Sequence, residues 1–95
     1  MDRYTFERRA AVVVHPGEHL RDELHARGWS QTEFARMIGR PLRLVNEIIN
    51  EKRGITPKTA LGFAAVLGTS AEYWMNLNTA YQLWKAVVAE GIWRT

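Results

Sequence analysis

Apolar residues recur at intervals of three and four along most of the chain, the spacing that brings them to one face of an α-helix. Glycines and helix-capping residues divide this pattern, because each marks a place where a helix ends or begins. The pattern predicts five helices, at about residues 17–27, 31–38, 41–50, 57–67 and 71–89. Ahead of them, Ala11–Val14 is either a short strand or an extended lead-in. Five helices in this order predict an all-α orthogonal bundle.

Each helix is expected to contribute one apolar stripe to the core. From the first helix, Leu20 and Leu24 face inward. The second and third contribute Phe34, Ala35, Ile38, Val45, Ile48 and Ile49. The fourth contributes Ala60, Leu61, Ala64 and Leu67.

Residues 30–50 have the pattern of two short helices joined by a tight turn. Ser30 and Glu33 form a capping box, which starts the first of them. Gly39 falls where the chain must turn sharply, and glycine adopts a left-handed conformation there at little cost. Pro41 suits the first turn of the second helix. Such a pair is typical of the helix-turn-helix, which places its second helix in the major groove of DNA.

The excess positive charge of the chain lies in and beside this motif. Residues 36–58 carry six basic and two acidic side chains, a net charge of +4, whereas the rest of the chain sums to −1. In an arbitrary domain a solvated basic face would be the preferred interpretation. Because this patch coincides with a helix-turn-helix, it indicates phosphate binding.

The outward face of the second motif helix is expected to meet base edges. Arg43 can bind guanine and Asn46 can bind adenine, each through two hydrogen bonds. Leu42 is expected to pack on a thymine methyl group. Glu47 either accepts a hydrogen bond from cytosine or holds Arg43 from one helical turn away, and the second role is favoured.

Phosphates are expected at three places around this helix. The first motif helix begins at Gln31, whose amide and neighbouring N–H groups can face a phosphate. Arg40 lies in the turn between the two helices. The third group surrounds the start of the fourth helix and consists of Lys52, Arg53, Thr56 and Lys58.

The last helix carries more apolar surface than one contact with a small core requires. Its main stripe, at heptad-like spacing, is Trp74, Leu77, Tyr81, Trp84 and Val88. A second stripe lies beside it and consists of Tyr73, Ala80 and Val87. So wide an apolar face predicts a dimer interface on the main stripe. The alternative is that both stripes pack within one chain.

Composition narrows the remaining functions. At 95 residues the chain makes one domain, and its hydrophobic fraction of 46% favours a folded core. It contains no cysteine, which excludes disulfides and thiolate metal sites and fits a cytoplasmic location. The apolar run Ala10–Val14 is too short for a signal-peptide core or a membrane span. We therefore expect no cofactor and no membrane association.

No motif in the chain predicts catalysis. His15 and His19 do not form the H-E-x-x-H pattern of zinc peptidases, so we expect no metal site, and His15 is assigned to hydrogen bonding at the start of the first helix. Ser30 and Ser70 are interpreted as helix caps rather than nucleophiles. The acidic residues of the first helix are interpreted as a solvated face: Glu18, Asp22 and Glu23. An enzyme is therefore not expected.

Motifs on both sides of the helix-turn-helix carry a family resemblance. In chain order they are His15–Glu18, Asn50–Thr56, Thr59–Leu61, Leu67–Ser70 and Glu72–Trp74. Together they resemble the HigA-type antitoxins, a branch of the Cro/C1-like, XRE-type helix-turn-helix proteins. The resemblance covers about residues 14–86.

The resemblance implies a lambda-repressor-like DNA-binding fold and a homodimer on a palindromic operator. It also implies the antitoxin of a type II toxin–antitoxin system, which represses its own operon and neutralises an RNA-cleaving toxin of the HigB type. The toxin could meet the N-terminal arm or the acidic face of the first helix, and neither is favoured. We expect an arm at residues 1–14, the DNA-binding domain with its dimerisation helix at 15–90, and a tail at 91–95.

Three other functions remain open. The chain could be a stand-alone transcriptional repressor without a toxin. It could be a protein-interaction module with a degenerate helix-turn-helix, because Glu47, Glu51 and two leucines lie near the recognition face. It could also be a regulatory domain related to those fused to metallopeptidases.

Overall fold

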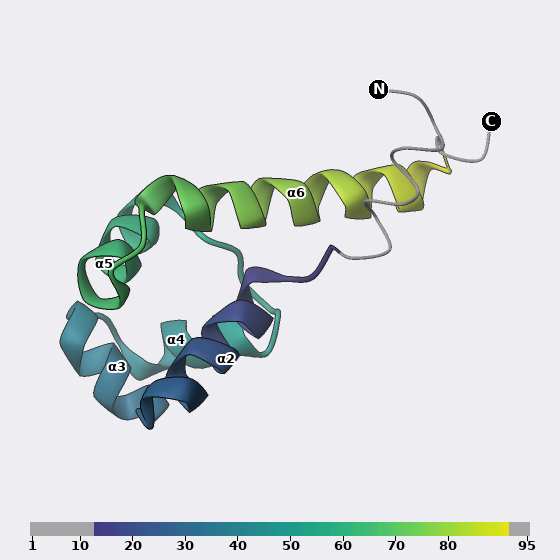
Figure 1. Cartoon of the computed structure of the whole chain (residues 1–95). Helices are drawn as coiled ribbons and strands as arrows, with labels where there is room; N and C mark the ends of the chain where they lie inside the picture. Colours follow the sequence, from purple (N-terminus) through teal and green to yellow (C-terminus); the bar gives the residue numbers. More distant parts are fainter. Residues whose placement is uncertain (1–12, 92–95) are drawn as a thin grey trace.

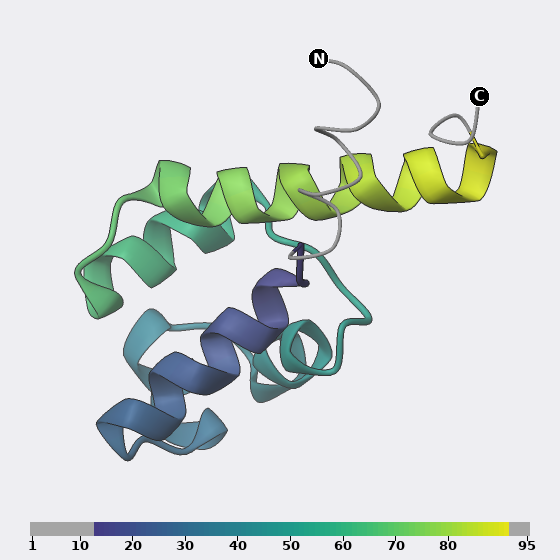
Figure 2. The same ribbon diagram turned by 45° about the vertical axis from the view of Figure 1, so that its right-hand side comes forward.

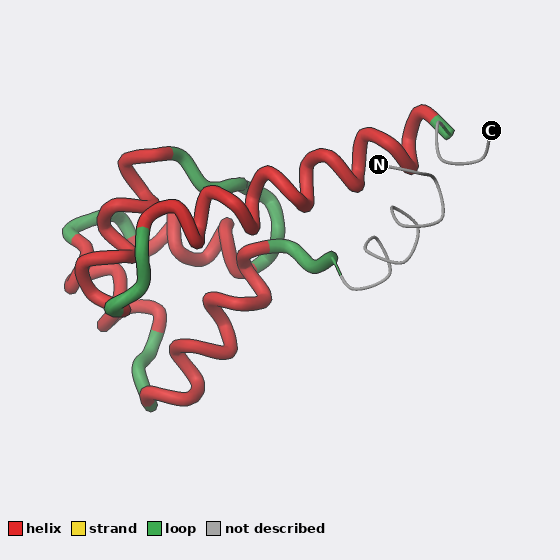
Figure 3. Tube along the Cα trace, turned by 45° about the horizontal axis from the view of Figure 1, so that its top comes forward, coloured by secondary structure: helices red, strands yellow, loops and turns green. Residues whose placement is uncertain are grey.

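A computed structural model of the protein describes residues 13–91 and contains five helices and no strand over that range. The helices are α2 (Pro16–Arg27), α3 (Gln31–Ile38), α4 (Leu42–Ile49), α5 (Pro57–Leu67) and α6 (Ala71–Glu90). Helices α2 to α5 surround a common core, and α6 runs across them and continues well past the bundle (Figure 1, Figure 2). Short loops join the helices (Figure 3). The predicted all-α bundle of five helices is confirmed.

The predicted N-terminal arm and C-terminal tail lie largely outside the described residues. Of the arm, only Val13 and Val14 are described, and they have no regular secondary structure. The strand or extended segment expected at Ala11–Val14 is therefore described only in its second half. Of the tail, only Gly91 is described, and it caps the end of α6.

Helix ends are made by residues that the sequence pattern singled out. Ser30 Oγ accepts from the Glu33 N–H at 3.0 Å and a Glu33 carboxylate oxygen accepts from the Ser30 N–H at 2.9 Å, which completes the capping box. Gly39 ends α3 with a φ of 68°, in the left-handed region that favours glycine. Pro41 is the N-cap residue of α4, so this helix begins at Leu42. The expectation that Pro41 lies in the first turn was wrong by one residue.

The core is built around a row of aromatic rings. Phe34 of α3 meets Phe63 of α5 at a centroid distance of 5.2 Å, and Phe63 meets Trp74 of α6 at 5.1 Å, both edge to face. Such pairs add about 0.5–1.5 kcal/mol to the burial of the rings. The predicted inward residues of α2, α3 and α4 are buried, except for Ile38, which is partly buried against the core. The predicted core is confirmed for these helices.

Helix α5 buries a different stripe from the one predicted. Ala60, Phe63 and Leu67 are buried, whereas Leu61 is 64% exposed and Ala64 is partly buried. Successive residues lie about 100° apart around a helix, so the stripe through Ala60 and Phe63 carries Leu61 out of the core. The prediction was wrong for Leu61 because Phe63, the larger side chain, takes the place facing Phe34 and Trp74.

Trp74 belongs to the core of its own chain. Its side chain is fully buried, and its Nε1–H donates to Thr69 Oγ1 at 2.7 Å. A buried tryptophan usually satisfies its N–H in this way. The prediction that Trp74 forms part of a dimer stripe was therefore wrong, because the first turns of α6 pack on α5.

The N-terminus of α2 packs closely against the C-terminal end of α4. His15 caps α2, and its Nδ1 accepts from the Gly17 N–H at 2.9 Å, which confirms the role assigned to this histidine. Burial holds the pKa of His15 below its ordinary value, since the charged ring would lose its hydration. The ring of Tyr81 on α6 covers it at a centroid distance of 4.8 Å. Three helices therefore meet at His15.

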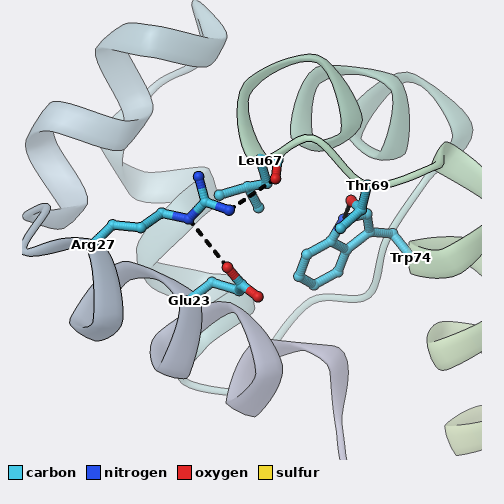
Figure 4. A network of polar contacts seen from close by, with 5 residues as sticks. All are labelled: Glu23, Arg27, Leu67, Thr69 and Trp74. Atoms are coloured by element: carbon cyan, nitrogen blue, oxygen red, sulfur yellow. Dashed lines mark hydrogen bonds and ion pairs between the residues drawn. The ribbon is translucent and has the colours of Figure 1, made fainter.

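A second set of contacts joins the ends of α2 and α5 (Figure 4). Arg27 Nη2 donates to the carbonyl oxygen of Leu67 at 2.8 Å, across 40 positions of sequence. The carbonyls in the last turn of a helix have no partner within it, so this bond satisfies one of them. Arg27 Nε also donates to Glu23 at 3.1 Å, which holds the guanidinium in place.

Gly17→Ala should destabilise the fold, because α4 leaves no space for a side chain at this position. A Cβ on Gly17 would lie 1.9 Å from the carbonyl oxygen of Ile48, so the backbone of one helix must move. Overpacking of a tight core costs about 1–3 kcal/mol, and we expect at least this loss in the free energy of unfolding. Chemical denaturation followed by circular dichroism measures it.

Gly62→Ala is the matched control. Its Cβ would lie 3.6 Å from Ile38 Cβ, an ordinary contact, in the interior of α5. Alanine is favoured over glycine there by about 0.5–1 kcal/mol, so this variant should be as stable as the parent or more so. Equal stabilities of the two variants would contradict the close approach of α2 to α4.

Candidate nucleic-acid interface

The outer face of α4 is polar and open to solvent, while its inner face is buried. Its eight residues include four buried ones: Leu44, Val45, Ile48 and Ile49. On the other side, Leu42 is 46% exposed and the side chain of Arg43 is 85% exposed. Asn46 is also exposed, and Glu47 is partly buried beside it. The four residues predicted to read bases therefore share one face of one helix.

A shallow groove separates this face from the beginning of α3. Its lining consists of Gln31, Thr32, Leu42, Arg43 and Asn46. The first two residues belong to the start of α3, where the backbone N–H groups lack helical partners and the helix dipole favours an anion. The groove therefore lies between a side suited to a phosphate and a side suited to base edges.

A row of amides crosses this groove. Asn50 Nδ2 donates to Asn46 Oδ1 at 3.1 Å, and Asn46 Nδ2 donates to Gln31 Oε1 at 3.2 Å. Because each amide nitrogen has two hydrogens and each oxygen two lone pairs, Asn46 keeps one donor and one acceptor for another molecule. That pair is what the major-groove edge of adenine requires.

Glu47 forms ion pairs with two arginines from different segments. One carboxylate oxygen, Oε2, accepts from Arg43 Nε at 3.2 Å, and the other, Oε1, lies 2.8 Å from Arg53 Nη2. The hydrogen bond from Arg43 is the main reason that the pKa of Glu47 is lowered, and the charge of Arg53 adds to it. Glu47 therefore stays ionised at neutral pH, and its observed partners agree with the favoured role of holding Arg43.

Arg40 extends from the turn toward the beginning of α5. Its Nη1 donates to Thr59 Oγ1 at 3.3 Å, and Thr59 Oγ1 lies 3.1 Å from Thr56 Oγ1. Thr56 is the N-cap of α5 and accepts from the Thr59 N–H. The charge of Arg40 and the positive end of the α5 dipole thus lie together, an arrangement that favours an anion.

The loop between α4 and α5 carries the remaining predicted phosphate contacts. Lys52, Arg53 and, on the first turn of α5, Lys58 are all exposed. Asn78 of α6 holds the loop, since its Oδ1 accepts from the Ile55 N–H at 2.9 Å. A Cβ at Gly54 would lie only 2.6 Å from the same oxygen. No local pattern points to Asn78, because the contact spans 23 positions of sequence.

The far half of α6 extends beyond the bundle (Figure 2). In the predicted dimer stripe, Leu77 packs partly against the core, Tyr81 and Trp84 are half-buried, and Val88 is 40% exposed. Leu83, which lies outside that stripe, is 49% exposed. Several large apolar side chains of α6 therefore remain accessible on the monomer.

Other kinds of site find no support in the part of the chain that the structure describes. Within residues 13–91, no three histidine, aspartate or glutamate side chains come close enough together to hold a metal ion. Over the same range, no helix combines the length and the apolar character that a bilayer crossing requires. Ser30 and Ser70 accept hydrogen bonds from backbone N–H groups at the starts of α3 and α6.

Two short helices, a tight turn and an exposed polar face on the second helix define a helix-turn-helix protein. The chain belongs to the helix-turn-helix family, which matches residues 20–74. A relative in sequence is virulence-associated protein I of Dichelobacter nodosus, 42% identical over 72 residues, which make up 75% of this chain and 67% of that protein.

Two solved structures are similar to nearly the whole described fold. One is an addiction module antidote protein of the HigA family from Coxiella burnetii, with 38% identity and a TM-score of 0.80 over 83% of this chain and 87% of that one. The other is the Pseudomonas aeruginosa antitoxin HigA with the higBA promoter, with 40% identity, a TM-score of 0.80 and the same two coverages. The predicted resemblance to HigA-type antitoxins is confirmed.

Proposed function

We propose that this protein is the sequence-specific DNA-binding antitoxin of a type II toxin–antitoxin system. In this role it binds a palindromic operator as a homodimer, represses its own operon in the cytoplasm and neutralises an RNA-cleaving toxin of the HigB type. The observation that carries the DNA-binding part is the exposed polar face of α4, surrounded by basic groups from three neighbouring segments.

Base readout is assigned to Arg43 and Asn46. Arg43 uses its Nε for Glu47, which leaves the two terminal nitrogens of the guanidinium for guanine O6 and N7. Asn46 has a donor and an acceptor left for adenine. Each contact should discriminate against a wrong base by about 1–3 kcal/mol. Leu42, exposed beside them, can meet a thymine methyl group.

Phosphate contacts are assigned to the groups around this face. They include the start of α3 at Gln31 and the start of α5 at Thr56. Arg40, Lys52, Arg53 and Lys58 add positive charge on the α5 side. The relative from Pseudomonas aeruginosa was solved with promoter DNA, which supports DNA binding by a protein of this fold.

The dimer is assigned to the exposed half of α6. Tyr81, Trp84 and Val88 fall on one side of α6, and Tyr81 also contacts His15. Beyond these contacts the helix extends past the bundle (Figure 1). An exposed apolar stripe of this kind is unfavourable in water unless a second molecule covers it. A two-fold dimer would space two copies of α4 by about one turn of DNA, which is the spacing a palindrome requires.

The antitoxin role is supported by the relatives rather than by a site on this chain. Of the two similar structures described above, one is named an antitoxin and the other an addiction module antidote protein of the HigA family. Another relative, 30% identical, is named an uncharacterized helix-turn-helix transcriptional regulator of Escherichia coli. A repressor that acts without a toxin is therefore the second candidate.

Arg43→Ala should remove the preference for a palindrome near the protein's own promoter. The loss of one guanine contact in each half-site should reduce discrimination against a scrambled duplex by at least about tenfold, with the fold unchanged. Fluorescence anisotropy in competition with the scrambled duplex measures this ratio. An unchanged ratio would remove Arg43 from base readout.

The matched control is Lys52→Ala combined with Lys58→Ala, which removes two charges without touching the pairs of Glu47. It should weaken binding to both duplexes equally. The plot of log affinity against log salt should flatten by about 0.9 for each phosphate that is no longer neutralised by a lysine. A slope equal to that of the parent protein would show that these lysines do not bind phosphates.

Val88→Glu should convert the dimer to a monomer, because a charge in a buried apolar interface has no partner. Light scattering at several protein concentrations gives the mass. Ala86→Glu adds the same charge on the opposite side of α6, at an exposed position, and should remain dimeric. The interface assignment is wrong if both variants keep the mass of the parent.

The antitoxin role predicts a neighbouring gene for a small basic protein that arrests growth when expressed alone. Co-expression of this chain should restore growth, and the two proteins should co-purify as a complex. Failure of this chain to relieve the arrest would rule out the antitoxin role and leave the repressor.

A further inference from the structure

We propose that Glu47 determines the specificity of this interface by holding the base-reading Arg43 and the loop residue Arg53 in one ion-pair cluster. The inference rests on the proposed function, since it concerns how a DNA-binding face separates its own operator from other sequences. The negative charge of Glu47 in a phosphate-binding surface weakens binding to all DNA, but it weakens binding to non-cognate DNA more than binding to the operator.

The geometry favours a positioning role for Glu47 over contact with a base. Oε2 accepts a hydrogen bond from Arg43 Nε at 3.2 Å, whereas Oε1 is buried, lies 2.8 Å from Arg53 Nη2 as an ion pair, and accepts no hydrogen bond from the described residues. The Glu47 side chain is 22% exposed, whereas that of Arg43 is 85% exposed. The carboxylate thus lies below the arginine that reaches outward, and a cytosine amino group would have to displace an arginine to reach it.

The ion pair with Glu47 holds the Arg43 side chain in the conformation in which it can bind guanine. A free, exposed arginine samples many rotamers, and fixing one of them on binding costs conformational entropy. The bond from Nε to Glu47 restricts those rotamers before DNA arrives. It also leaves the terminal edge of the guanidinium directed away from the carboxylate, and this edge is the one that meets guanine O6 and N7.

The charge of Glu47 acts in the opposite direction on phosphates. It lies within the segment of residues 36–58, whose net charge is +4, and it occupies Arg53, one of the groups assigned to phosphate binding. Non-cognate binding depends almost entirely on phosphate contacts, whereas cognate binding also gains base contacts. On non-cognate DNA, Glu47 therefore only lowers the affinity. On the operator, part of this loss is offset because Glu47 positions Arg43 for its base contact.

Glu47→Gln tests this inference, because glutamine keeps the size of the side chain and removes its charge. We expect binding to a scrambled duplex to tighten by at least about threefold. Discrimination at the base pair read by Arg43 should fall by at least about fivefold. Fluorescence anisotropy with the full chain, on the operator, on a set of single-base variants and on the scrambled duplex, gives both quantities.

Glu51→Gln is the control for net charge. Glu51 is exposed and lies four residues further along, so its replacement removes the same formal charge from the same segment while the pair of Glu47 with Arg43 remains. This variant should tighten binding to operator and scrambled duplex by the same factor and leave discrimination unchanged. If Glu47→Gln and Glu51→Gln behave alike, Glu47 acts only as a charge and the inference is overturned.

A double variant separates positioning from direct contact. In the Arg43→Ala background, Glu47→Gln should no longer change discrimination at any base pair, because there is no reading side chain left to position. A further loss of discrimination in that background would mean that Glu47 reads a base itself, which overturns the inference. The proposed function fails separately, if the parent protein does not prefer its promoter to the scrambled duplex.

Discussion

The burial of one face of α4 is the constraint on which the rest of the structure depends. Val45 and Ile48 are fully buried, and Leu44 and Ile49 are nearly so. Each such side chain contributes roughly 1.5–3 kcal/mol when it leaves water, which is as much as one good contact with a base. Rotation of α4 about its axis would expose several of them at once. Apolar packing therefore sets the direction of Arg43 and its neighbours before any electrostatic interaction with another molecule takes part.

Most of the fold, and the identity of the exposed face of α4, could be predicted from the sequence because the signals are local. The capping box at Ser30 and the left-handed Gly39 mark helix ends within a few residues of themselves. The period of α4 leaves one choice for its inner side, since its apolar and polar residues separate cleanly. Helix α5 is apolar on more than one side, so its period fits two rotations. Only the aromatic packing of Phe63 shows that Leu61 faces outward.

The details of the site that escaped prediction are contacts between distant segments. Spacing suggests the pair of Glu47 with Arg43, but it gives no sign of the second pair with Arg53, which depends on the path of a loop. In the same way, nothing near Gln31 indicates that it meets Asn46, 15 positions away. Trp74 was assigned to the wrong surface because heptad spacing does not show where a helix leaves its own core. These contacts depend on tertiary packing, and the periodicity of a single helix gives no information about it.

The hydrogen bond from the loop before α5 to Asn78 divides α6 into two parts, one that contacts the rest of the fold and one that extends past it. The turns up to Tyr81 are tied to the core, to His15 and to this basic loop, so a change there is transmitted to the surface beside α4. The last turns of α6 lie past the bundle (Figure 2). A substitution in the outer half of α6 can therefore alter the association of two chains without moving the loop, whereas a substitution in the inner half acts on both.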